Sequence, residues 1–302
     1  MEKFISVFDM FKIAVGPSSS HTLGPWLAAK NCMEKIEANW GLDKVNAIQV
    51  LLYGSLAKTG KGHGTDMAVL MGLMGEDPIT TDIDLIETAL TYIKNNKKIC
   101  FQNKHSIAFN IETDLQFLKD KILPHHPNGI ELVVTLGNQK LTFTYFSIGG
   151  GFVEEQLQID HQIIYQSLAN NSATKDWEVP FDFKNADELL HWCIKTGLSI
   201  CDIVKENEKN YKEEAQLIPA LDSIWEVMLQ CIYKGCHTEG NLPGGLLVQR
   251  RAFALNKKLL MGASYSNREE WLLAIKNTGQ NFSTILDWVS CFALAVNEQN
   301  AS

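Results

Sequence analysis

The stretch that decides the fold is Ala47-Ile-Gln-Val-Leu-Leu-Tyr53, which continues into Gly54-Ser-Leu-Ala-Lys-Thr-Gly-Lys-Gly-His-Gly-Thr-Asp66. Its first part is apolar and β-branched, as a buried strand requires. Its second part is rich in glycine and leads into a segment whose apolar residues recur at helical spacing. The stretch therefore predicts a strand, a loop whose backbone a ligand can approach closely, and a helix over Thr65–Met74.

The rest of the first half alternates helical and strand patterns. The predicted elements are helices at Thr22–Trp40 and Ile83–Asn95, hairpin strands at Ile130–Leu136 and Lys140–Phe146, and an edge strand at Ile107–Ile111. The hairpin turns at Gly137, where glycine tolerates the backbone conformation of a tight turn. We therefore expect an α+β N-terminal domain over residues 1–160.

The second half is helical in pattern from start to end. Its predicted helices are Ala186–Val204, Leu217–Tyr233, Leu246–Met261, Arg268–Asn277 and Phe282–Asn297. Small polar residues that end at Pro180 predict a linker over residues 161–185, ahead of an all-α domain over residues 186–302. Because the last predicted helix is almost wholly apolar, we expect an incomplete helical domain that continues beyond Ser302, with a natural polar tail as the alternative.

Composition limits the function classes. The chain has 302 residues, 45% of them hydrophobic, and a formal net charge of -8. Nucleic acids and anionic membranes attract a net positive face, so the sequence argues against both as partners. The sequence has neither an apolar run of membrane-spanning length nor an export signal, which predicts a cytoplasmic protein that binds a small molecule.

The cysteines are too scattered for a covalent framework. They are Cys32, Cys100, Cys193, Cys201, Cys231, Cys236 and Cys291. An odd number in a long chain indicates reduced thiols. Cys231, Cys236 and His237 lie close together but lack a second ligand pair, so we interpret them as core residues rather than as a zinc site.

A hydroxyl-rich segment, Gly16-Pro-Ser-Ser-Ser-His-Thr-Leu-Gly24, precedes the first long helix. Hydroxyls and backbone N–H groups at a helix N-terminus favour an anionic group such as a carboxylate. An ordinary helix cap is the alternative, but a cap needs only one hydroxyl. We therefore interpret the segment as a ligand site.

The glycine-rich stretch Gly54–Asp66 contains a candidate acid/base group. It resembles a phosphate-binding loop, yet the spacing of Gly54 and Gly60 differs and Gly62 occupies the position of the magnesium-binding hydroxyl, so nucleotide binding is disfavoured. His63 lies between glycines, which indicates a mobile imidazole suited to proton transfer. Asp66 would either orient that imidazole or cap the next helix.

Two further segments carry polar groups on turns. His125-His-Pro-Asn-Gly129 offers imidazoles and an amide, and Ser147-Ile-Gly-Gly-Gly-Phe-Val153 places glycines after a strand. Each alone is also typical of an ordinary exposed turn or hinge.

Taken together, the motifs resemble those of the iron-sulfur-dependent L-serine dehydratases. They are Ser6-Val-Phe-Asp-Met-Phe-Lys-Ile13, Gly16–Gly24, Gly60-Lys-Gly-His-Gly-Thr-Asp66, His126-Pro-Asn128, Ser147-Ile-Gly-Gly-Gly-Phe152, Leu242-Pro-Gly-Gly-Leu246 and Asn297-Glu-Gln-Asn-Ala301. The resemblance implies an N-terminal domain like the allosteric substrate-binding domain of phosphoglycerate dehydrogenases, followed by a helical domain that holds a four-iron four-sulfur cluster. It also implies deamination of L-serine to pyruvate and ammonia without pyridoxal phosphate, by a homo-oligomer that we expect to be a dimer.

The resemblance also assigns roles to residues. His63 matches the family's catalytic base, and the matching substrate-binding residues are Ser18, Ser19, Ser20, His21, Thr22, Lys61, His126 and Asn128. The cysteines of this chain do not stand in the family's cluster-binding contexts, so no metal ligand is assigned here and the cluster ligands are expected beyond Ser302. A non-catalytic serine-binding or regulatory module is the alternative.

Overall fold

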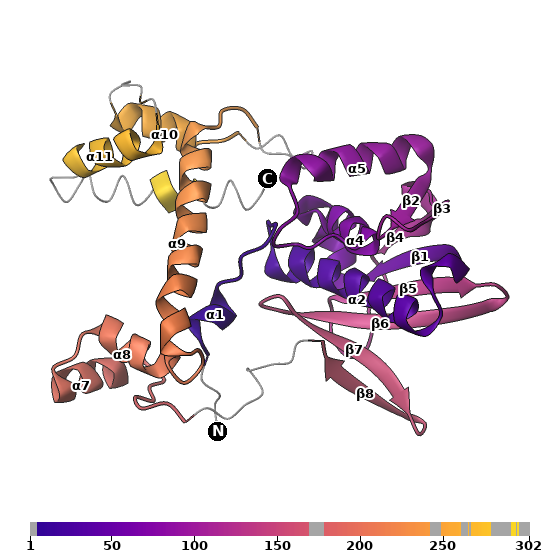
Figure 1. Ribbon diagram of the computed structural model, residues 1–302, viewed down its shortest axis with the longest axis horizontal. Coiled ribbons are helices and arrows are strands. Elements are labelled where there is room, and N and C mark those ends of the chain that lie inside the picture. The colour runs from indigo at the N-terminus through magenta and orange to yellow at the C-terminus, as the bar shows by residue number, and fades with distance from the viewer. Residues whose placement is uncertain are drawn as a thin grey trace. The chain divides into compact units, whose positions relative to one another are not determined.

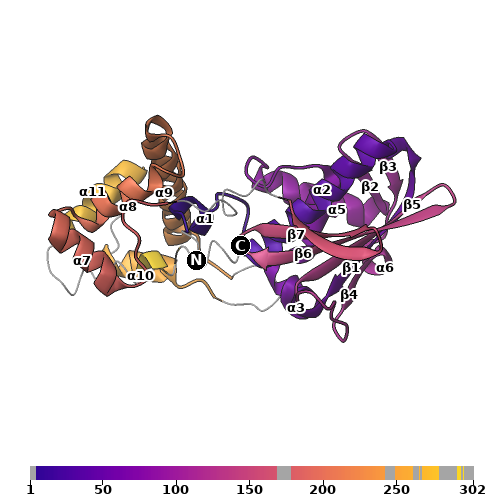
Figure 2. The same cartoon turned by 90° about the horizontal axis from the view of Figure 1, so that it is seen from below.

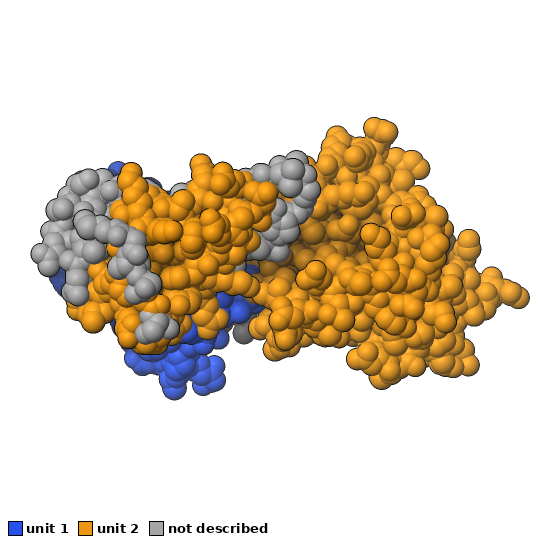
Figure 3. Space-filling view, turned by 90° about the horizontal axis from the view of Figure 1, so that it is seen from above, with its two compact units in different colours: residues 1–13, 169–227 blue, residues 14–168, 228–302 orange. Residues whose placement is uncertain are grey.

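The computed structural model describes residues 5–168, 178–241, 249–260, 265, 267–278, 291–293 and 295 of the chain. The chain divides into two compact units (Figure 3). One consists of Met1–Ile13 with Ala169–Val227, and the other consists of Ala14–Leu168 with Met228–Ser302. Our domain boundaries at residues 160 and 185 remain a prediction.

A six-stranded mixed sheet forms the centre of residues 14–168, in the order β4-β1-β5-β6-β7-β8 (Figure 1). The strands are β1 (Val45–Tyr53), β4 (Leu115–Leu118), β5 (Gly129–Leu136), β6 (Gln139–Gly149), β7 (Phe152–Ile159) and β8 (Gln162–Ser167). Strand β1 runs parallel to β4 and antiparallel to β5, and the later strands form an antiparallel meander. The sheet thus extends to Ser167, past the start of the predicted linker, because β8 pairs with β7 along its length.

The helices of this part are α2 (Gly24–Asn39), α3 (Gly54–Thr59), α4 (Thr65–Met74), α5 (Ile83–Asn96) and the short α6 (Ile111–Asp114). Helices α2 and α5 lie on one side of this sheet (Figures 1 and 2). Helix α2 packs against α4 and against β6. At Gly72 of α4 a β-carbon would lie 2.3 Å from the carbonyl oxygen of Trp26, so this close helix contact requires glycine.

The core lies between these helices and the sheet. Trp26, Met33 and Ile36 of α2 are fully buried, as is Leu52 of β1. The helical spacing of the first three puts them on one face of α2, which explains why the helix covers the sheet. The predicted helix Thr65–Met74 is confirmed as α4, and the predicted strand and hairpin are confirmed as β1, β5 and β6.

Two predictions for this part need correction. The edge strand predicted at Ile107–Ile111 is β3 (His105–Ala108), which pairs with β2 (Lys98–Phe101) in a separate two-stranded sheet. The predicted loop after β1 is instead helical, with α3 followed by a 3₁₀ turn at Gly60–His63. Tertiary contacts have therefore overridden the low helix propensity of glycine.

The other unit is built from short helices. They are α1 (Val7–Met10), α7 (Ala186–Thr196), α8 (Ile200–Glu208) and the first part of α9 (Glu214–His237). The single helix predicted over Ala186–Val204 is wrong, because Gly197 ends α7 at a φ of 74° and Ser199 caps α8. The buried carboxylate of Glu208 accepts hydrogen bonds from the Ser6 hydroxyl and the Val7 N–H, at 2.6 and 2.7 Å, and so binds the N-terminal segment to α8.

Residues 228–302 contain α10 (Ala252–Leu259) and α11 (Arg268–Thr278). The end of α9 and these helices share a small core that includes Cys236, Trp271 and Cys291. The helix predicted over Leu246–Met261 starts later than expected, at Ala252, because Gln249 forms an isolated β-bridge with Asn241 and the described residues 249–251 are not helical. Residues 242–248 and 261 lie outside the described residues. Most of the predicted helix Phe282–Asn297 and the motifs at Leu242–Leu246 and Asn297–Ala301 lie outside them too. In the part of the chain that is described, no helix is long and apolar enough to cross a membrane.

Candidate active site

The hydroxyl-rich segment forms a π-helical turn, Ser19–Leu23, that leads directly into α2. Such turns are frequently found at functional sites. Ser18 begins the turn: its hydroxyl accepts from the His21 N–H at 3.2 Å, and its carbonyl accepts from Thr22 and Leu23 at 2.9 and 3.0 Å. These N–H groups are therefore used within the turn, which leaves side chains as the groups that can meet a ligand.

The glycine-rich segment presents His63 at the end of its 3₁₀ turn. Nδ1 of His63 lies 2.9 Å from the carbonyl oxygen of Thr59. A carbonyl only accepts hydrogen bonds, so Nδ1 carries the proton and the lone pair is on Nε2. The described residues provide no hydrogen-bond partner for Nε2, so this atom is available as a base. Asp66 lies in the first turn of α4 and accepts from the Met67 N–H at 3.0 Å, but the helix begins after Gly64 without a side-chain cap, so the predicted capping role of Asp66 is not observed.

The two segments meet at a pair of histidines. The rings of His21 and His63 have centroids 5.0 Å apart and an interplanar angle of 39°. The Thr22 hydroxyl donates to the carbonyl of His63 at 2.8 Å, and the Thr65 hydroxyl donates to the carbonyl of His21 at 2.6 Å. These reciprocal bonds hold the segments together.

His21 is bound through both ring nitrogens. Nδ1 lies 2.9 Å from the Ser20 hydroxyl, and Nε2 lies 3.0 Å from the Ser55 hydroxyl. Burial and the neighbouring His63 lower the pKa of His21, and a hydrogen bond to the Ser55 backbone opposes that change. Above its ordinary pKa of about 6.5 the ring is therefore neutral.

The histidine turn adjoins the start of α3. The Ser55 N–H donates to the carbonyl of Pro127 at 2.9 Å. Gly54 has a φ of 51°, and a β-carbon there would lie 2.2 Å from the same carbonyl oxygen, so only glycine allows this approach. Nδ1 of His126 accepts from the Asn128 N–H at 3.1 Å. Burial and the neighbouring His125 lower the pKa of His126, while Glu154 opposes this.

Asn128 and Ser147 carry buried polar atoms without a partner. The Asn128 amide nitrogen donates to the Ser147 carbonyl at 3.0 Å, and the Ser147 N–H donates to the Asn128 carbonyl at the same distance. Among the described residues, however, neither Asn128 Oδ1 nor Ser147 Oγ has a hydrogen-bond partner. Buried polar atoms nearly always have one, so these two atoms mark a place for a polar ligand or water.

The structure brings together most of the predicted site residues. Ser18, Ser20, His21, Thr22 and His63 form one bonded cluster, and His126 and Asn128 adjoin it through the contact between Pro127 and Ser55. Ser19 and Lys61 are exposed, and the Lys61 ammonium lies 5.5 Å from the centroid of the Phe117 ring.

Sequence reasoning missed several groups that complete this cluster. They are Ser55, Thr59, Thr65 and Ser147. Ser55, Thr59 and Thr65 lie in the glycine-rich segment and Ser147 begins the later glycine motif, but no spacing rule identifies which hydroxyl or carbonyl faces an imidazole.

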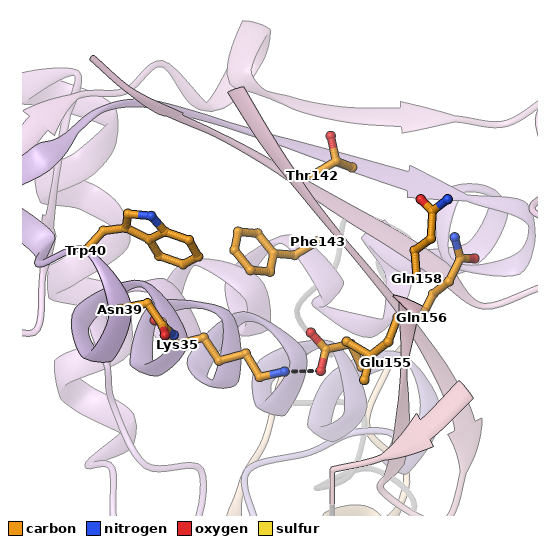
Figure 4. A pocket seen from close by; sticks show the side chains of 9 residues that line it. Lys35, Asn39, Trp40, Thr142, Phe143, Glu155, Gln156 and Gln158 are labelled. Carbon is orange, nitrogen blue, oxygen red and sulfur yellow. Dashed lines mark hydrogen bonds and ion pairs between the residues drawn. The ribbon is translucent and has the colours of Figure 1, made fainter. Parts of the chain in front are cut away.

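A hollow of about 390 Å³ lies between the end of α2 and strands β6 and β7 (Figure 4). It is lined by Lys35, Asn39, Trp40, Thr142, Phe143, Glu155, Gln156, Leu157 and Gln158. Lys35 and Glu155 form an ion pair at its base (Figure 4). No predicted site residue lines this hollow.

The cluster around His21 and His63 suits proton transfer on a small polar substrate. It combines an imidazole with an available Nε2, a neutral imidazole beside it, hydroxyls and an unpartnered amide oxygen. Fold and site together thus define a class: an α/β protein with a candidate histidine acid/base site on the loops around its sheet.

Comparison with known proteins identifies the family. Residues 6–158 match the serine dehydratase beta chain, and residues 195–302 match the serine dehydratase alpha chain. The chain therefore belongs to the serine dehydratase family.

Curated relatives agree over nearly the whole chain. L-serine dehydratase of Streptomyces coelicolor is 38% identical over 300 residues, which cover 99% of this chain and 61% of the relative. L-serine dehydratase 1 of Escherichia coli gives the same identity and coverage. L-serine dehydratase of Helicobacter pylori is 34% identical over 304 residues, 98% of this chain and 60% of the relative. The chain thus spans about three fifths of the length of these relatives.

Proposed function

We propose that this chain forms the substrate-facing part of an L-serine ammonia-lyase, which converts L-serine to pyruvate and ammonia. Family membership and the names of the curated relatives support this activity. The observation that carries the proposal is the state of His63. Its Nδ1 is held by the carbonyl of Thr59, and its Nε2 lone pair is available for a proton.

In this proposal Nε2 of His63 removes the α-proton of L-serine. The α C–H bond breaks, its electrons form the double bond of aminoacrylate, and the β-hydroxyl leaves with a proton as water. Aminoacrylate then tautomerises and is hydrolysed to pyruvate and ammonia. Because His21 is neutral, it does not repel the imidazolium that His63 becomes, which favours the proton transfer.

The proposed substrate-binding roles follow the match to the family's motifs. We assign them to Ser18, Ser19, Ser20, His21, Thr22, Lys61, His126 and Asn128. The unpartnered Oδ1 of Asn128 suits the substrate ammonium, and the Ser18 and Ser20 hydroxyls suit its carboxylate. The Thr22 hydroxyl is already bound to the His63 carbonyl, so its contribution is to position the loop.

The proposal includes a four-iron four-sulfur cluster and no pyridoxal phosphate. The described residues contain no group of three or more potential metal ligands, and their cysteines form no disulfide. The cluster therefore does not fit on the described residues of this chain, and we propose that its ligands come from additional chain. Binding and proton transfer are the parts of the reaction that we assign to the residues here.

The wider features of the proposal are those of the family resemblance. The N-terminal part is proposed to be similar to the allosteric substrate-binding domain of phosphoglycerate dehydrogenases. The active protein is proposed to be a cytoplasmic homodimer that acts on L-serine and has neither nucleic acid nor membrane as a partner. The cysteines of the described residues form no disulfide, which is consistent with a reducing compartment.

The test is an activity assay on the protein at the length of its relatives, reconstituted anaerobically with iron and sulfide. We expect pyruvate to form from L-serine, with D-serine as the matched control substrate. A protein whose cluster absorbance is intact but which makes no pyruvate from L-serine would contradict the proposal.

A serine-binding or regulatory module is the second candidate function. The unpartnered atoms of Asn128 and Ser147 favour it, because they indicate a ligand place that needs no cluster. Calorimetry of the 302-residue chain with L-serine tests it. Binding, together with a longer protein that has a cluster but no turnover, would favour this candidate, and absence of binding would exclude it.

A further inference from the structure

Ser55 is the residue at which the segments of the site meet. Its hydroxyl lies 3.0 Å from Nε2 of His21, and its N–H donates to the carbonyl of Pro127 at 2.9 Å. Its carbonyl accepts from the Thr59 hydroxyl at 3.0 Å. The carbonyl of Thr59 in turn holds His63. Ser55 therefore contacts the hydroxyl-rich turn and the histidine turn directly, and the His63 segment through Thr59.

The position of the Ser55 hydroxyl is fixed from the backbone. Gly54 enters α3 with a φ of 51° and lies against the carbonyl of Pro127, where a β-carbon would be only 2.2 Å away. The Gly54 N–H also donates to the carbonyl of Lys121 at 2.8 Å. These contacts fix the backbone at the start of α3. The backbone position from which the half-buried Ser55 side chain extends is therefore fixed as well.

His21 depends on this hydroxyl for one of its two ring contacts. Ser20 binds Nδ1 and Ser55 binds Nε2, so each nitrogen has one hydroxyl partner. Without Ser55, Nε2 would lose its partner and the ring could turn about its last side-chain torsion. The ring of His63, with its centroid 5.0 Å away, would then lie against a ring without a fixed orientation.

We propose that Ser55 is a positioning residue: its hydroxyl holds the His21 ring in one orientation, and through His21 it holds the ring of His63. This inference rests on the proposed function of His63 as the base. Ser55 does not touch the substrate in this arrangement. It acts on the geometry of proton transfer and not on the affinity for L-serine.

The kinetic test uses the reconstituted protein at the length of its relatives. We expect Ser55→Ala to lower kcat about tenfold, the effect of one lost hydrogen bond, and to leave KM for L-serine within about twofold. Ser55→Thr keeps the hydroxyl and should restore kcat. Ser106→Ala, at an exposed position on β3, is the matched control and should be unchanged. An unchanged kcat in Ser55→Ala, or a loss that Ser55→Thr does not restore, would overturn the inference.

A spectroscopic test separates this inference from the proposed function. Long-range proton–nitrogen spectra of the 302-residue chain, labelled with ¹⁵N-histidine, report on each ring nitrogen separately. We expect the Nε2 signal of His21 to shift in Ser55→Ala, because that nitrogen loses its hydroxyl partner, and the ring signals of His63 to shift with it. Unchanged His21 and His63 signals in the variant would overturn the inference whatever the activity. Absence of pyruvate from the unmodified protein would instead remove the proposed function, and the spectra would still test the link from Ser55 to His21.

Discussion

Two polar clusters in residues 14–168 differ in how far their buried groups are satisfied. In the hollow beside α2, the buried carboxylate of Glu155 is paired with Lys35. Near Glu155, but outside the lining of the hollow, the Tyr145 hydroxyl donates to Asn31 at 3.2 Å. In the loop site, Asn128 Oδ1 and Ser147 Oγ are buried without any partner among the described residues. A satisfied network stabilises a fold, whereas unpartnered buried atoms require a water, an ion or a ligand to satisfy them. The difference distinguishes a structural cluster from a functional one.

The surroundings of the hollow support its structural role. Burial raises the pKa of Tyr145 well above its usual value, with further contributions from Cys32 and Glu155. Burial likewise raises the pKa of the Cys32 thiol, and the nearby Glu155 adds to this. Groups that keep their protons over the physiological range do not transfer them, so this cluster is poorly suited to acid/base chemistry.

The largest expected effect is on activity, from His63→Ala in the reconstituted protein. Loss of a general base lowers kcat by about 10²–10⁴-fold, and the free energy of unfolding should stay within about 0.5 kcal/mol because this half-buried side chain packs little. Pyruvate formation and urea unfolding measure the two quantities. If the variant retained its activity with an intact cluster, His63 would not be the base.

The second effect concerns stability and comes from Glu155→Gln. The Glu155 side chain is 4% exposed and that of Lys35 is 35% exposed, so the pair is only partly shielded from water. We expect a loss of about 2 kcal/mol in urea unfolding of the chain, below the ~3–5 kcal/mol of a fully buried pair. The double variant Lys35→Met with Glu155→Gln should recover part of that loss.

The matched control for this variant is Glu37→Gln, which removes an exposed ion pair with Lys104. Exposed pairs contribute about 0–1 kcal/mol, so the control should unfold almost as the unmodified chain does. Equal unfolding midpoints for Glu155→Gln and Glu37→Gln would remove the structural role of the hollow. A large loss of kcat in Glu155→Gln would weaken the distinction between the two clusters.

The third effect is a pH dependence of stability. A histidine with a lowered pKa in the folded chain binds fewer protons than in the unfolded chain, as expected for His21 and His126. Their contribution is complete above the unfolded pKa of about 6.5 and is lost as the pH falls towards the lowered folded values. NMR titration should place the pKa of His21 below about 6.5. His63→Ala should raise the pKa of His21, because the neighbouring His63 is one of the causes that lower it. An unchanged pKa in that variant would show that the rings do not interact.

Local patterns predicted the elements whose burial follows from spacing. The helix Thr65–Met74 was predicted to the residue because its apolar spacing and its flanking glycines are local features. The helix α3 was missed because glycine-rich sequence argues against a helix, and only the contact between Gly54 and Pro127 reveals why the chain turns there. Strand β7 was not predicted. It contains the charged residue Glu155, which is buried only because it pairs with Lys35, 120 residues away in the sequence. No local pattern shows this pairing.

The same limit applies to the site. The motifs identified His21 and His63 as candidates, because imidazoles beside serines and glycines have few structural uses. They did not identify Ser55, which lies 34 residues from His21 and contacts it only in the folded chain. Resemblance to a family supplied the reaction, and geometry supplied the tautomer of His63 and the unpartnered atoms.

The smallest expected effects on stability come from two buried serines, Ser6 and Ser147, which can be compared directly. The Ser6 hydroxyl donates to Glu208 at 2.6 Å, whereas the Ser147 hydroxyl has no partner among the described residues. Removing a bonded hydroxyl costs about 1–2 kcal/mol, but removing an unsatisfied one is close to neutral or stabilising. Urea unfolding should therefore show a loss for Ser6→Ala and none for Ser147→Ala. Calorimetry with L-serine should show the reverse order, with affinity reduced about threefold to tenfold only in Ser147→Ala. A stability loss in Ser147→Ala equal to that in Ser6→Ala would mean that the hydroxyl is already satisfied within the fold and does not await a ligand.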